Sequence, residues 1–380
     1  MIRQGHIDRI EAILVLWFAI GAKVMLNFPA SLIAEGSSAG WLVIITSGLV
    51  ALLGVLPGVA LMRRFEGASF ARAADESVGL VLGKLASLAI TLLLGFIAAL
   101  VTREFAEGFV IAILPRTPLV VVEVTFILVA AFSAYHGLEG IGRVSIFLAP
   151  WLLVFLMVVL VGASSEFDLR RLTPFWGLGP LDIAWDMWKR SAVYAEVVIL
   201  PILYPYLRVE SQARPVAVWG MALSIAVLTA VQVAVTGIFD VLNTDRTAFP
   251  IVSLARMITL GRFLTRIEAI LIFLWIFVAL MNVSVLVWAA VTNLAETLRL
   301  PDYQPLVPAA ATIVAAGAFL PRGLRQAATL DFEFARIWAG LIAFVIPLLL
   351  WLAAVVRRKK ADLGGQPGRP GGEADDAGEE

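Results

Sequence analysis

The chain of 380 residues contains no cysteine and only two histidines, His6 and His136. Without cysteine there can be no disulfide scaffold, iron–sulfur cluster or metal–thiolate site. Two histidines so far apart in the sequence argue against a histidine-built metal centre. We therefore expect neither a metal ion nor another cofactor.

Charge is also scarce. Charged residues make up 15% of the chain, and 29 basic residues balance 29 acidic ones, so bulk electrostatics gives no attraction to nucleic acid. The sequence has no P-loop, no HExxH motif and no paired carboxylates in a recognisable soluble catalytic domain. We expect no nucleic-acid partner and no enzymatic activity.

Apolar residues are in large excess. They form 61% of the chain, against about 45–50% in soluble domains, and mean hydropathy is +0.93. Such a composition predicts an all-α integral membrane protein, with the lipid bilayer as its surroundings. About ten apolar runs are long enough to cross it; they lie near residues 10–34, 39–62, 85–114, 118–135, 141–163, 187–207, 215–239, 264–294, 305–321 and 334–356.

An even number of spans places both termini on one side of the membrane. Lysines and arginines gather between spans two and three, between spans six and seven, and after span ten. This side should be cytoplasmic. We expect one polytopic domain over residues 1–360 and a disordered, acidic, Gly/Pro-rich cytoplasmic tail over 361–380.

Two of the spans carry a charge beside helix-breaking residues. The sixth contains Glu196 with Pro201 and Pro205, and the first contains Lys23 with Pro29. Proline removes a backbone donor and disturbs the helix before it. With five spans on either side of the polar stretch 164–189, the broken helices occupy corresponding positions of two halves. This pattern indicates a 5+5 inverted repeat of the transporter type with its site at the breaks.

Lys23 and Glu196 have opposite charges near the centres of their spans. One interpretation is a buried ion pair that fixes helix packing. The other is that they bracket a zwitterion, with the ligand carboxylate towards Lys23 and its ammonium towards Glu196. Tyr194 could offer its hydroxyl to the same ligand. Both interpretations stay open at this stage.

A second charged group lies in span three, where Arg103, Glu104 and Glu107 follow one another. Arg103 and Glu107 are one helical turn apart and could simply neutralise each other. Alternatively, Glu104 or Glu107 contacts a neighbouring subunit or takes part in proton or ion movement.

Polar residues of span eight, such as Asn282 and Asn293, are typical of groups that hold helices together. Ile251, Leu254, Ala255 and Ile258 have the spacing of a short amphipathic helix, for which Gly261 is the predicted stop.

Five stretches in sequence resemble the spore germination B-subunit (GerAB-like) family of the amino acid, polyamine and organocation transporter superfamily. They are the first span with Pro29, and residues 100–118, 135–151, 172–180 and 249–275. The resemblance implies a LeuT-like fold with a pocket between spans one, three, six and eight. It also implies a nutrient sensor of the spore inner membrane that works with an A-type membrane subunit and a C-type lipoprotein.

The resemblance places ligand contacts in the two unwound stretches, which gives Gly21, Ala22, Lys23, Tyr194, Glu196 and Ile199 as site residues. Lys23 departs from the small or polar residue usual at the first break, so it could replace a coupling cation or meet a substrate carboxylate. The sequence is compatible with a germinant receptor subunit for a small nutrient such as an amino acid. It is also compatible with a proton-coupled amino acid transporter, and with a scaffold whose pocket is vestigial.

Overall fold

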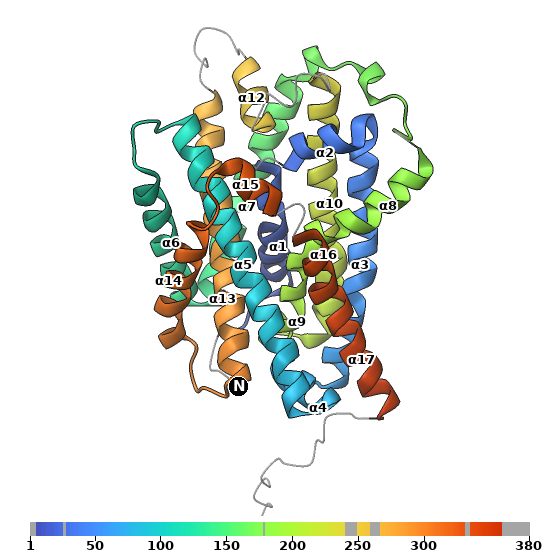
Figure 1. Cartoon of the computed structure of the whole chain (residues 1–380), viewed down its shortest axis with the longest axis vertical. Coiled ribbons are helices and arrows are strands. Elements are labelled where there is room, and N and C mark those ends of the chain that lie inside the picture. The colour runs from blue at the N-terminus through green and yellow to red at the C-terminus, as the bar shows by residue number, and fades with distance from the viewer. Residues whose placement is uncertain are drawn as a thin grey trace, which may run out of the picture.

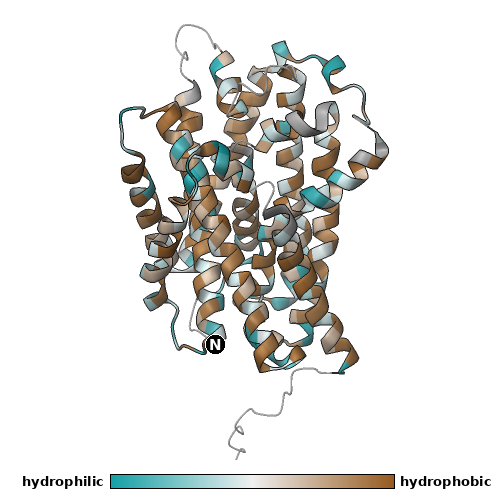
Figure 2. Ribbon diagram, in the orientation of Figure 1, coloured by the Kyte–Doolittle hydropathy of each residue, from teal (hydrophilic) through white to brown (hydrophobic). Residues whose placement is uncertain are grey.

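The computed structural model describes residues 5–25, 28–177, 179–239, 249–258, 267–330 and 335–358. Within these ranges the regular structure is helical, apart from one isolated bridge between Ile7 and Leu207. The helices stand side by side as a bundle (Figure 1). Apolar residues cover most of the length of these helices (Figure 2), as expected for a bundle surrounded by lipid. The predicted tail, 361–380, lies outside the described residues.

Seven helical segments of the described chain are long and apolar enough to cross a membrane. They correspond to predicted spans two, three, four, five, seven, eight and ten. Their helices are α3 (Gly40–Arg64), α5 (Leu80–Ala112), α6 (Leu119–His136), α7 (Leu138–Gly162), α10 (Ala213–Ile238), α13 (Ile267–Thr297) and the continuous run of α16 (Ala335–Gly340), η10 (Leu341–Val345) and α17 (Ile346–Val356). The ninth span is shorter, with η8 (Gln304–Leu306) leading into α14 (Val307–Ala318).

The first and sixth spans are interrupted, as predicted. Span one consists of α1 (Arg9–Gly21), the 3₁₀ turn η1 (Ala22–Met25) and α2 (Phe28–Gly36). Span six enters through the amphipathic α8 (Pro180–Ser191) and continues as η5 (Ala192–Val198), α9 (Ile199–Leu203) and η6 (Tyr204–Tyr206). Each break therefore falls at the charge-bearing residues.

Short helices lie in the connections between the long ones. They are α4 (Phe70–Val78), α12 (Pro250–Met257) and α15 (Leu324–Thr329), with short 3₁₀ turns in the loops. Helix α12 confirms the amphipathic helix predicted near residue 250, since Ile251, Leu254 and Ala255 are buried while Arg256 is exposed. It ends at Met257, whereas the sequence suggested a stop at Gly261, which lies outside the described residues.

Glycines let α3 pass very close to its neighbours. A Cβ on Gly54 would lie 2.7 Å from the Phe344 ring, and one on Gly58 would lie 2.9 Å from Cγ of Pro201. Small residues at such contacts bring helix backbones together where lipid provides no hydrophobic drive. The broken sixth span is thus held tightly against α3.

The segment before α1 pairs with the end of span six at one end of the bundle. The backbone N–H of Ile7 donates to the Tyr206 carbonyl at 3.0 Å, and that of Arg208 donates to the Ile7 carbonyl at 3.0 Å. Asp8 pairs with Arg208 at 3.1 Å. The first described residues and the end of α17 lie at this same end (Figure 1), in agreement with an even number of spans.

Candidate functional site

The two breaks meet through an ion pair inside the bundle. The Lys23 ammonium lies 2.5 Å from Oε1 and 2.6 Å from Oε2 of Glu196. It also donates to the backbone carbonyl of Val193. Glu196 is fully buried and Lys23 is 6% exposed. The structure therefore brings together the two charges that the sequence singled out.

The unwound backbone explains this geometry. Tyr194 has φ −98° and ψ 16°, outside helical values, so the 3₁₀ segment η5 turns at this residue. A carbonyl at such a turn lacks its helical partner and must be satisfied in another way. The Lys23 ammonium satisfies the Val193 carbonyl, so a side chain of span one replaces a backbone donor of span six.

The other predicted ligand residues lie on the same two broken segments as the ion pair. Ala22 and Ile199 are buried, at the start of η1 and of α9, and Gly21 is half-buried. The Tyr194 hydroxyl donates to the Ile44 carbonyl of α3 at 3.1 Å. In this conformation the Tyr194 hydroxyl is therefore hydrogen-bonded to span two.

Asn282 of α13 supports the first break from the opposite side. Its side-chain amide donates to the carbonyl of Ala19, and more weakly to that of Phe18 at 3.5 Å. These carbonyls lie in the last turn of α1, where helical partners run out. Asn282 is fully buried. The sequence indicated helix contact for Asn282, but not that its partner is the broken helix itself.

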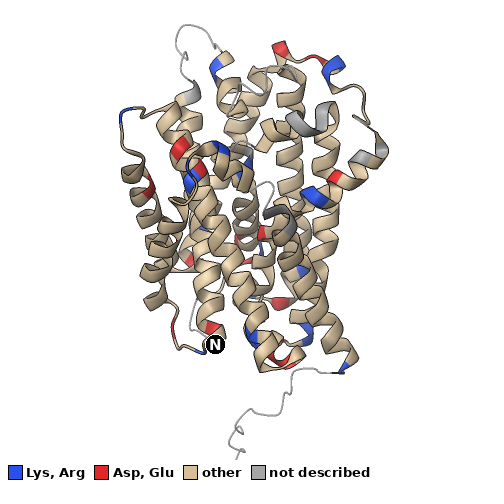
Figure 3. Ribbon diagram, viewed as in Figure 1, with Lys and Arg blue, Asp and Glu red and all other residues tan. Residues whose placement is uncertain are grey.

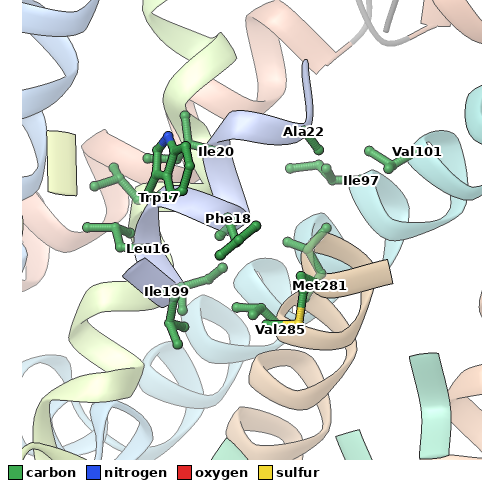
Figure 4. Packing of buried hydrophobic residues seen from close by; sticks show 14 of the residues in the cluster. Leu16, Trp17, Phe18, Ile20, Ala22, Ile97, Val101, Ile199, Met281 and Val285 are labelled. Carbon is green, nitrogen blue, oxygen red and sulfur yellow. The ribbon is translucent and has the colours of Figure 1, made fainter. Parts of the chain in front are cut away.

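Apolar side chains enclose the site. Figure 4 shows residues of α1, α5, α9 and α13 converging around Phe18, while Trp17 projects to another side of α1. The cavity beside the break measures only about 10 Å³, room for about one water molecule. Its lining comes from spans one, five, seven and eight and consists of Trp17, Phe18, Gly21, Met25, Leu152, Leu156, Val227 and Val278. Lys23 and Glu196 do not line this cavity, and their 2.5 Å contact leaves no space for a ligand between them.

A larger hollow of about 750 Å³ lies away from the breaks, between α4 and the end of α13. Four of its charged side chains form the pairs Arg72–Glu76, at 2.8 Å, and Arg299–Asp75, at 3.5 Å. It does not touch Lys23 or Glu196. Charged residues gather at such ends of the bundle and are sparse in its middle (Figure 3).

The charged group of span three is a second buried cluster. Arg103 contacts Glu107 at 2.6 Å and Glu123 of α6 at 3.1 Å. Glu104 is also buried, at 2% exposure, and takes part in other interactions. Sequence reasoning missed Glu123, although a lone carboxylate in an apolar span is itself a signal. The cluster lies on α5 and α6, so it is separate from the two breaks.

The described residues contain no group of three histidine, aspartate or glutamate side chains that could hold a metal ion. The chemistry available at the breaks is instead that of one ammonium, one carboxylate and freed backbone groups. Such a set can exchange its internal ion pair for the two charges of a zwitterion.

Curated proteins of Bacillus subtilis (strain 168) are similar to this chain along most of its length. Spore germination protein KB is 23% identical over 367 residues, which cover 92% of this chain and 94% of the relative. Spore germination protein A2 is 21% identical over 337 residues, covering 88% and 92%. Spore germination protein B2 is 25% identical over 258 residues, covering 67% and 70%.

Solved transporter structures share the fold. MHP1, a nucleobase-cation-symport-1 family transporter in a closed conformation with bromovinylhydantoin bound, aligns with a TM-score of 0.70 at 13% identity, over 93% of this chain and 79% of that one. MhsT in complex with L-phenylalanine aligns with a TM-score of 0.61 at 15% identity, over 93% and 99%.

At these identities the likeness to solved structures concerns the fold alone. It confirms the predicted LeuT-like architecture with broken first and sixth helices. A family model described as spore germination protein, the spore permease family, matches residues 9–323, and the chain therefore belongs to this family of membrane proteins.

Proposed function

We propose that this chain is the B-type subunit of a spore germinant receptor, which binds a small nutrient, an amino acid, where the two broken helices meet. The nutrient's carboxylate binds Lys23 and the freed backbone donors, and its ammonium binds Glu196. Gly21, Ala22, Tyr194 and Ile199 complete the contacts. Family membership supports the germination role.

The ion pair between Lys23 and Glu196 is the observation on which this proposal depends. Both of its charges are buried and both sit at a break. A zwitterion inserted between them supplies an opposite charge to each partner, so no charge is left unpaired in a medium of low dielectric constant. A ligand with only one charge would leave either Lys23 or Glu196 uncompensated.

The closed ion pair supports a role in signalling. No ligand fits between Lys23 and Glu196 while they are 2.5 Å apart, so the two breaks must separate when the nutrient enters. A ligand that binds only the opened form shifts the chain towards that form. This shift is the signal that we propose the chain passes to an A-type membrane subunit and a C-type lipoprotein in the spore inner membrane, with both of its own termini cytoplasmic.

A proton-coupled amino acid transporter is the second candidate. The transporter folds of the solved neighbours favour it, and so does the position of Lys23. Its ammonium contacts a carbonyl and a carboxylate, the same oxygen ligands that a coupling cation would use. Arg103, Glu104 and Glu107 would then take part in ion movement, whereas in a receptor they would couple to the neighbouring subunits.

Counterflow of labelled alanine and other amino acids into liposomes that contain only this chain distinguishes the two candidates. A transporter gives flux that the Glu196→Gln variant loses. A receptor subunit gives no flux, while the same preparation still binds an amino acid at equilibrium. Absence of both flux and binding for every amino acid tested would contradict the proposed site.

A further inference from the structure

One guanidinium serves two carboxylates between α5 and α6. Arg103 Nη2 lies 2.6 Å from Glu107, and Nη1 lies 3.1 Å from Oε1 of Glu123. The side chains of Arg103, Glu107 and Glu123 are 8%, 12% and 0% exposed. If both carboxylates were ionised, the three groups would carry one uncompensated negative charge in the interior of the protein, where this is costly.

The two carboxylates are not equivalent. The second oxygen of Glu123, Oε2, is buried, and no described residue forms a hydrogen bond with it. An ionised carboxylate with an unpartnered buried oxygen loses much more hydration energy than a neutral acid does. Glu107 keeps some exposure and lies next to the Gly323 turn before α15. A surplus negative charge is therefore less favourable on Glu123 than on Glu107.

Within the described parts of the helices packed on α6, Arg103 is the only cation at the Glu123 end. Arg322 and Arg325, in and beside the turn next to Glu107, are exposed. Arg103 of α5 is the cation that contacts its carboxyl, at 3.1 Å. Helix α14 carries no charged residue, and α7 carries Glu139 and Arg143 at its start, at the far end of α6. Helix α13 carries only acidic residues, Glu268 and Glu296, at its two ends. Arg103 is thus shared by the two carboxylates, and its contact with Glu107 is shorter than its contact with Glu123.

We propose that Glu123 is a proton-binding site that carries its proton while Glu107 is the counter-ion of Arg103. A proton added to Oε2 removes the surplus charge and leaves Oε1 as a neutral acceptor for the guanidinium. The site is independent of Lys23 and Glu196, and so of the proposed nutrient site.

Infrared difference spectra of the purified full-length chain in lipid nanodiscs at pH 7 test this directly. Glutamine has the shape of a neutral glutamic acid, so Glu123→Gln should fold, keep the thermal midpoint of the wild type, and remove the carbonyl stretch of one protonated carboxyl group. Glu107→Gln leaves Glu123 as the sole counter-ion of Arg103. It should therefore also remove that stretch, and a new carboxylate band should replace it.

The matched control is Glu139→Gln, which changes an exposed glutamate paired with Arg143 at 2.5 Å over the same one-turn spacing. This control should remove a carboxylate band only. The proposal is overturned if Glu123→Gln also removes a carboxylate band. It is equally overturned if Glu123→Gln fails to fold or melts far below wild type, because a neutral isostere is then not tolerated.

Discussion

Lys23 and Glu196 give the sharpest prediction at the scale of single residues. Glu196→Gln leaves a buried ammonium without its counter-ion, so stability should fall by about 3–5 kcal/mol. The double variant Lys23→Met, Glu196→Gln removes both charges and should recover most of that loss. Thermal unfolding in the same detergent measures both values. Neither variant should bind an amino acid.

This pair of variants separates packing from ligand binding. If the ion pair only fixes the helices, the double variant will restore stability and nutrient binding together. If the pair receives a zwitterion, stability will return without binding. Equal melting of the single and double variants would show instead that the 2.5 Å contact contributes little to stability.

Asn282 should act on the site through the backbone of α1. Asn282→Ala removes donors to the carbonyls of Phe18 and Ala19, which should cost about 1 kcal/mol of stability and weaken nutrient binding. Asn293→Ala is the matched control, since it removes donors to Ser87 and Thr91 of α5, away from the breaks. It should cost similar stability and leave binding unchanged. Equal binding losses in both variants would argue against a specific role for Asn282.

The sequence predicted the charged residues better than it predicted their partners. Lys23 and Glu196 are conspicuous because charges are rare inside spans, and opposite signs near two breaks suggest contact. The partners of Asn282, Tyr194 and Arg103 depend instead on the rotation and depth of neighbouring helices. The sequence of a uniformly apolar span says little about how the helix is rotated about its axis, since its lipid-facing and buried sides are equally hydrophobic. Glu123 was visible in the sequence as a lone carboxylate in an apolar span, but its pairing with Arg103 depends on this rotation.

At the scale of elements, the contact between α3 and span six is testable with glycine substitutions. A Cβ on Gly58 would lie 2.9 Å from the rigid ring of Pro201, so Gly58→Ala should destabilise the chain by about 1–3 kcal/mol. Gly95 of α5 has open space, so Gly95→Ala should be neutral or stabilising by up to about 1 kcal/mol. Unfolding midpoints compare the two. A stable Gly58→Ala variant would mean that α3 and span six are less tightly packed than the structure shows.

The number and order of spans could be read from sequence, because length and hydropathy determine what can cross a bilayer. The breaks in spans one and six could also be predicted, since proline and glycine have local effects. The entry into span six was harder to predict. Residues 187–191 were assigned to the span, but they belong to α8, which is amphipathic and exposes Trp185 and Trp188. Tryptophan occurs both at the membrane interface and within spans, so composition alone could not show that residues 187–191 lie outside the sixth span.

At the scale of the whole molecule, orientation can be tested because the chain has no native cysteine. Single cysteines at Glu66, before α4, and at Thr117, in the α5–α6 loop, lie at opposite ends of α5. In sealed right-side-out vesicles an impermeant maleimide should label Thr117→Cys and spare Glu66→Cys. The reverse pattern would place both termini outside and contradict the distribution of lysine and arginine.

Equilibrium binding of labelled amino acids to the purified chain, beside the double variant Lys23→Met, Glu196→Gln, tests the nutrient site most directly. If the double variant melts close to the wild type, as we expect, loss of binding in it cannot be attributed to unfolding. We expect at least one amino acid to bind the wild type saturably, and this binding to fall to background in the double variant. Undiminished binding in the double variant would place the nutrient elsewhere and contradict the proposed role of the two broken helices.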